Sequence, residues 1–217
     1  MPGQIKIDDG AGNYTILTNA GSLGSDKTIT IPNETATLAT TTATDLGGLV
    51  KLASSTASSS PTLTFDNFVD ENTYSEYIII MRNIIPQTDN TKLRYVYRSS
   101  TPSDITGTYY RSGVYYYGDN ASSGFETNLS DTNFGVISDL GNDTNETLSG
   151  KFSFYYGAGS FSSSIVGKFF RHNPFAGVHA QEYGGFLKAT DSIAGIKFYM
   201  SSGNITSGSI YIYGVKK

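Results

Sequence analysis

The longest apolar stretch of the chain runs over residues 77–85 and is dominated by isoleucine. It is far shorter than the roughly 20 apolar residues of a membrane helix, and β-branched and aromatic residues favour strands. Pro86, which cannot donate to a sheet ladder, follows directly. The pattern predicts a buried core strand. Its expected partner is the last part of the chain, where residues 196–201 and 210–214 alternate on either side of a turn at 202–204.

Strand-like segments recur at short, regular spacing from Pro61 to the end of the chain. Residues 148–156 have the clearest period of two, with Leu148, Phe152, Phe154 and Tyr156 on one face. No window has a helical stripe of useful length, and residues 66–74 are the best candidate for a helical turn. The pattern predicts an all-β fold, an antiparallel β-sandwich of jelly-roll type. The expected strands are 77–85, 93–97, 113–117, 134–137, 148–156, 165–170, 178–186, 196–201 and 210–214.

Residues 1–60 differ in pattern from the rest of the chain, because their β-like segments are too short to form a hydrophobic core. These pieces are residues 5–7, 14–17, 28–31 and 35–38. A cysteine-free segment below about 70 residues usually needs another subunit to complete its core. We therefore expect residues 1–60 to intertwine with copies of themselves as a stalk or attachment region. The serine-rich stretch 53–61 is interpreted as a linker, and residues 61–217 as a sandwich head with its own core.

Composition narrows the function classes. Only 16% of the residues are charged, against about 25% in typical soluble domains, so Ser, Thr, Asn and Gly must cover the surface. The formal net charge of -4 and the scattered basic residues argue against a nucleic-acid partner. The absence of cysteine excludes disulfides and thiolate zinc sites.

The N-terminal residues lack the pattern of a signal peptide, and no segment is apolar enough for membrane insertion. A protein with an extracellular type of surface and no export signal is expected in a virus particle, made in the host cytoplasm and released by lysis.

Two parts of the sequence resemble the C-terminal β-sandwich of bacteriophage tail-fibre proteins, particularly those of tailed phages of aquatic bacteria. They are residues 192–215 and residues 77–86 with the following 93–97. Residues 27–33, 37–39 and 45–53 resemble short segments that recur between fibre domains. The resemblance implies a virion structural protein assembled as a homotrimer, a tail fibre or receptor-binding protein that adheres to a host surface glycan. It also implies that residues 1–60 contact other virion proteins of the tail or capsid. A head fibre or capsid decoration protein remains the alternative.

Aromatic clusters are the first candidates for receptor contacts. Tyrosine rings stack on sugars, although alternate residues of a strand belong to the core whatever the function. The clusters are Tyr109 with Tyr110, residues 115–117, and residues 155–156. Tyr109, Tyr110 and Arg111 are selected because a loop position is expected for them.

The segment 168–175 brings long side chains together on a surface of small residues. Its favoured interpretation is a strand that ends at Pro174 with a solvated basic tip. Arg171, His172 and Asn173 are nevertheless the second group of candidate receptor contacts. The two histidines, His172 and His179, have no paired acid at a readable spacing and are expected to be ordinary loop or strand residues.

Metal binding and catalysis are the alternative functions. Asp139, Asn142, Asp143, Asn145 and Glu146 are oxygen ligands that suit calcium, but they lack the order of a known calcium loop and also fit the needs of a turn. No serine-hydrolase elbow and no β-helix repeat is visible. We therefore predict a protein that is not an enzyme and needs no metal or cofactor.

Overall fold

The computed structural model describes residues 5–8, 14–17, 48–118, 123–156, 161–173 and 177–217. The chain divides into two units, Met1–Ala43 and Thr44–Lys217. In the first unit, β1 (Ile5–Asp8) and β2 (Tyr14–Leu17) pair as antiparallel strands, which confirms two of the expected short pieces. The expected strands at 28–31 and 35–38 lie outside the described residues.

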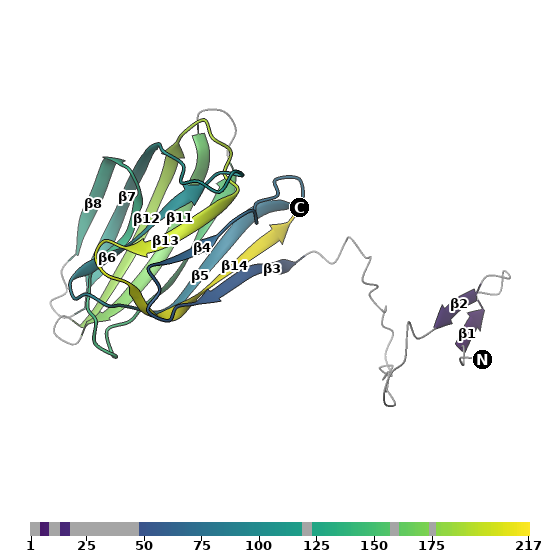
Figure 1. Cartoon of the computed structure of the whole chain (residues 1–217), viewed down its shortest axis with the longest axis horizontal. Coiled ribbons are helices and arrows are strands. Elements are labelled where there is room, and N and C mark those ends of the chain that lie inside the picture. Colours follow the sequence, from purple (N-terminus) through teal and green to yellow (C-terminus); the bar gives the residue numbers. More distant parts are fainter. Residues whose placement is uncertain (1–4, 9–13, 18–47, 119–122, 157–160, 174–176) are drawn as a thin grey trace. The chain divides into compact units, whose positions relative to one another are not determined.

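The second unit is an antiparallel β-sandwich, as predicted, and no helix occurs among the described residues. One sheet has eight strands in the order β3-β14-β5-β10-β11-β12-β7-β8, and the other has four in the order β4-β13-β6-β9. In Figure 1, β4, β6 and β13 lie in front of the larger sheet. The strands are β3 (Leu49–Thr56), β4 (Thr62–Phe65), β5 (Tyr74–Pro86), β6 (Thr91–Arg98), β7 (Thr108–Tyr117), β8 (Ser123–Asp131), β9 (Phe134–Leu140), β10 (Leu148–Tyr156), β11 (Phe161–Asn173), β12 (Gly177–Lys188), β13 (Gly195–Met200) and β14 (Ile205–Lys216).

The isoleucine-rich stretch forms β5, a core strand paired on one side with β14 and on the other with β10. Ile79 lies opposite both Ile212 and Phe152, so long-range pairing closes the sheet as expected. One part of this expectation was wrong. β13 belongs to the four-stranded sheet, because the turn at 202–204 carries the chain from one sheet to the other.

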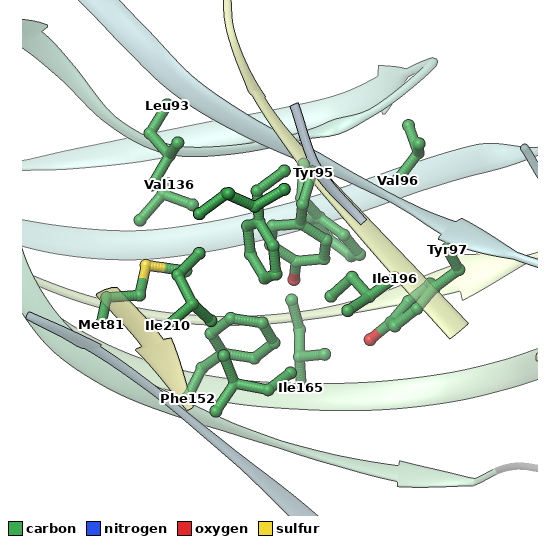
Figure 2. Packing of buried hydrophobic residues seen from close by; sticks show 14 of the residues in the cluster. Met81, Leu93, Tyr95, Val96, Tyr97, Val136, Phe152, Ile165, Ile196 and Ile210 are labelled. Carbon is green, nitrogen blue, oxygen red and sulfur yellow. The ribbon is translucent and has the colours of Figure 1, made fainter. Parts of the chain in front are cut away.

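The core lies between the two sheets and is built largely from aromatic rings. Tyr95 of β6 stacks on Phe152 of β10 across the sandwich, with ring centroids 4.9 Å apart. Figure 2 shows these two rings among aliphatic side chains such as Ile165 and Ile210. Burial raises the pKa of Tyr95 well above its usual value, so its hydroxyl stays protonated.

The predicted boundary at residue 60 was wrong. Residues 49–56 form β3, an edge strand paired with β14, and Ser60 bridges to Ile205. Leu52 and Ala53 of this strand pack against the core, and a register shift opposite them breaks the regular alternation. The stretch 53–61 is therefore part of the sandwich, and the compact unit begins at Thr44.

The candidate helical turn at 66–74 is confirmed as a single turn at residues 70–74, where the backbone N–H groups of Thr73 and Tyr74 donate to the carbonyl oxygen of Asp70 at 3.3 and 3.1 Å. The Asp70 carboxylate accepts hydrogen bonds from the backbone N–H of Asn72 at 3.0 Å and from the hydroxyl of Thr73 at 2.7 Å. These bonds hold a turn, and the bond from Thr73 is the main cause that lowers the pKa of Asp70. No helix of the length and apolar character needed to cross a membrane occurs in the described ranges.

Candidate functional site

The large apolar side chains that the described chain exposes all lie on strands of the eight-stranded sheet. The four-stranded sheet packs against its inner face, so alternate residues of each strand face away from the core. Phe125 on β8 is 85% exposed, and Val166 and Phe170 on β11 are more than half exposed. Apolar residues at such positions gain nothing from folding, so exposed patches of this kind often mark interaction sites.

A groove of about 490 Å³ crosses this face between β7 and β12. It is lined by residues 110–112 of β7 and 184–186 of β12. The register pairs Tyr110 with Phe186 and Ser112 with Gly184, so aromatic rings stand beside a floor of small residues. The rings of Tyr110 and Phe186 stack with centroids 4.7 Å apart and planes inclined by 22°. We call this feature the aromatic groove.

The two neighbouring glycines of the groove have different roles. A Cβ atom at Gly185 would come within 2.3 Å of the backbone oxygen of Tyr110, so close packing requires glycine there. A Cβ atom at Gly184 would meet only the backbone oxygen of Ile165, at an ordinary 3.6 Å. Packing therefore does not require glycine at position 184, and its missing side chain keeps the groove open.

A second, smaller hollow of about 310 Å³ continues from the groove and shares Ser112 and Gly184 with it. Val114 and Val166 line it, together with Lys168 and Glu182, which form an exposed ion pair at 2.9 Å. The two hollows offer ring faces, aliphatic surface and hydroxyl groups along one open surface. This combination suits the binding of a ligand with both apolar faces and polar edges, as sugars have.

The first group of sequence candidates lies in β7, and the loop position expected for it was wrong. Tyr109 is 1% exposed, and its hydroxyl accepts from the backbone N–H of Tyr97 and donates to the carbonyl oxygen of Ile105. Tyr110 points the other way and lines the aromatic groove. Of this group, only Tyr110 has a side chain on the open face.

Arg111 is 5% exposed and belongs to a buried polar cluster. Its guanidinium donates to the Glu126 carboxylate of β8 and to the carbonyl oxygen of Gly135 on β9 of the opposite sheet. The Gln181 amide donates to the other Glu126 oxygen at 2.6 Å. This geometry joins three strands of one sheet to the other sheet, so Arg111 is a structural residue.

Arg171 is likewise buried, at 4% exposure, and the predicted solvated tip was wrong for it. Its Nε donates to Nδ1 of His179 at 2.9 Å, and its Nη1 donates to the carbonyl oxygen of Asp139 on β9. Burial and then the Arg171 charge lower the pKa of His179, and Asp139 and Glu126 oppose this shift. His179 also stacks on Tyr117 with centroids 4.4 Å apart.

The remaining candidates of that group are at the end of β11. His172 is exposed, and its Nδ1 lies 2.7 Å from the carbonyl oxygen of Asn145. Asn173 is the last residue of the strand and pairs in register with Gly177, while its side chain lies outside the described part. The structure therefore does not bring these residues together with Tyr110 in one groove.

In the oxygen-rich segment 139–146, Asp139 belongs to β9 and residues 143–146 form a turn. The Glu146 carboxylate accepts from the backbone N–H of Asp143 at 3.3 Å, and the Glu146 N–H donates to the Asp143 carbonyl at 2.9 Å. Within the described ranges, no group of three or more acidic, histidine or cysteine side chains is placed to hold a metal ion. These hydrogen bonds support the interpretation of residues 143–146 as a turn.

Sequence reasoning missed Ser112, Gly184 and Phe186 as site residues. The alternation in 178–186 did predict the strand, and the Gly184-Gly185 pair was the available signal for a hollow. Which face of the strand stays uncovered depends on the opposite sheet, which the local pattern does not show. Comparison with family models, with curated proteins and with solved structures found no match for this chain.

Proposed function

We propose that this chain is a bacteriophage virion structural protein, a tail fibre or receptor-binding protein, whose sandwich adheres to a host surface glycan through the aromatic groove. The observation that carries the proposal is the open groove with its stacked Tyr110 and Phe186 and its unfilled floor at Gly184. The low charge of the chain and the resemblance of its sequence to tail fibres give further support.

The unequal sheets suit this function. Eight paired strands give a rigid platform, so the groove needs little ordering when a ligand binds. A single sugar contact is weak, and a homotrimer would gain apparent affinity by engaging several receptors together. In this proposal residues 1–43 provide the trimeric attachment to the particle, in place of the 1–60 expected from the sequence.

A glycan array probed with purified full-length protein tests the proposal, followed by titration of the best glycan. Gly184→Leu should weaken binding at least tenfold because its side chain fills the groove, and Tyr110→Ala should weaken it by a similar factor. Phe125→Ser, on the same face but outside the groove lining, is the matched control and should bind as the wild type does. Equal binding by all three variants, or no glycan bound at all, would contradict the proposal.

The alternative is a head fibre or capsid decoration protein, and one observation favours it. Phe125, Val166 and Phe170 expose apolar surface outside the aromatic groove, which a neighbouring particle subunit would cover. Labelled particles imaged by electron microscopy distinguish the two, because a fibre is located at the tail and a decoration protein on the capsid. Light scattering that shows a stable monomer at micromolar concentration would contradict the trimer.

A further inference from the structure

A separate hollow of about 430 Å³ lies where β5 and β14 depart from regular pairing. Its lining includes Arg82 and Asn83 from β5, Ser207, Ser209 and Tyr211 from β14, and Thr147 from the connection before β10. None of these residues lines the aromatic groove. We call this feature the bulge hollow.

Two bulged backbone segments create the hollow. Asn83 has φ 51° and Gly208 has φ 110°, both in the left-handed region. The register between β14 and β5 shifts on both sides of Ser207, and the register between β10 and β5 shifts after Leu148. A Cβ atom at Gly208 would lie 2.6 Å from the carbonyl oxygen of Asn83, so only glycine permits this approach.

The bulge changes the hydrogen bonding of Asn83 as well. Its N–H donates to the hydroxyl of Ser149 at 3.0 Å, outside the regular strand ladder. Bulges and left-handed residues cost conformational free energy, and they concentrate where a strand re-aims side chains for function. Here they set Arg82, Asn83 and Ser209 around one opening.

The charge of the hollow is positive. The Arg82 side chain is exposed and makes no ion pair or hydrogen bond with any described residue. The Lys51 ammonium lies 5.5 Å from the ring centroid of the neighbouring Tyr211. The described residues that line the hollow contribute hydroxyls, an amide and a guanidinium, but no carboxylate.

We propose that the bulge hollow binds an acidic saccharide, with the carboxylate of the sugar on Arg82 and its ring beside Tyr211. A guanidinium binds a carboxylate with two parallel hydrogen bonds, and serine and threonine hydroxyls match sugar hydroxyls. The proposal adds a second, charge-selective site to the proposed adhesion function. It does not depend on the aromatic groove, and the experiment separates the two sites.

The experiment is isothermal titration of full-length protein with oligogalacturonate, and with its methyl ester as the neutral control of the same ring structure. We expect the acid to bind, and the ester to bind at least tenfold more weakly. Arg82→Gln should weaken binding of the acid by tenfold or more, since charge-assisted hydrogen bonds are the strong ones. Binding should also weaken as salt rises from 50 to 500 mM.

Two variants serve as controls. Lys188→Gln removes the same charge from an exposed position on β12 and should leave binding of the acid unchanged. Gly184→Leu fills the aromatic groove and should also leave it unchanged. Inorganic phosphate that competes as well as the sugar would reduce the site to a general anion site and overturn the saccharide assignment. Equal binding of acid and ester, no binding of the acid, or no effect of Arg82→Gln would overturn the proposal.

Discussion

Replacing Arg111 by Met tests whether this residue supports the sandwich or contacts a receptor. Met keeps an unbranched apolar stem and removes the guanidinium, so it isolates the hydrogen bonds to Glu126 and Gly135. The sequence selected Arg111 as a receptor contact, while the structure places it in a buried cluster between the sheets.

The expected magnitude follows from burial. Removing one member of a buried ion pair costs about 3–5 kcal/mol, mainly because the other charge is left uncompensated. The Glu126 side chain is 32% exposed, so water reaches it and the lower end applies, about 3 kcal/mol. Glu126→Gln should cost a similar amount, because the Arg111 side chain is only 4% exposed and keeps its charge.

The double variant makes the test sharper. Arg111→Met with Glu126→Gln leaves no stranded charge, so its cost should stay near 3 kcal/mol and fall short of the sum of the two single costs. Chemical denaturation of the full chain, followed by circular dichroism, measures all three. Arg82→Met is the matched control at an exposed arginine and should shift stability by no more than about 0.5 kcal/mol.

The reasoning is refuted if Arg111→Met changes stability by less than about 1 kcal/mol. If glycan binding then falls tenfold in the same variant, Arg111 contacts the receptor as the sequence suggested.

Two further predictions concern the domain boundary and pH. A chain starting at Thr44 should unfold at the same denaturant concentration as the compact unit of the full protein. A chain starting at Pro61 lacks β3 and should unfold at a lower denaturant concentration. Equal midpoints for the two chains would show that β3 contributes nothing to the stability of the sandwich. The folded-state pKa of His179 lies below its unfolded value near 6.5. Between these two pKa values the unfolded chain binds a proton on His179 that the folded chain does not bind. The free energy of unfolding should therefore fall as pH drops below about 6.5, until the folded-state pKa is passed. Groups that face His179 are Arg171 from β11, Asp139 from β9, Glu126 from β8, and Tyr115 and Tyr117 from β7. His179→Gln should remove this part of the pH dependence in denaturation experiments, while His172→Gln at the exposed histidine should keep it; a slope that survives His179→Gln contradicts the assignment.

Much of the fold was readable from the sequence, because strand alternation is a local property. The period of two in 148–156 matches β10, and the isoleucine-rich stretch matches the centre of β5. The strands that sequence reasoning missed are the two at 49–56 and 62–65, together with 123–131. Small or polar residues fill most of their positions, and such residues become strands only through their neighbours in the sheet.

The candidate site was less readable, for a different reason. Alternation shows that Tyr109 and Tyr110 face opposite sides, but it does not show which side the second sheet covers. The groove also depends on β12, whose Gly184 and Phe186 lie more than 70 residues further along the chain. Register between distant strands is fixed by the whole sheet, so the pairing of Tyr110 with Phe186 could not be read from either segment alone.

The unequal width of the two sheets explains why the arginines were misassigned. The smaller sheet ends at β9, whereas the larger sheet continues through β12, β7 and β8. Apolar side chains of β7 and β12 still pack into the core there, as Tyr109 and Leu187 do. Arg111 and Arg171 lie on the same inner face, and both end on backbone carbonyls of β9. An arginine within a predicted strand therefore indicated the edge of the core. Arginine can bury its aliphatic stem along apolar surface while its guanidinium group makes hydrogen bonds.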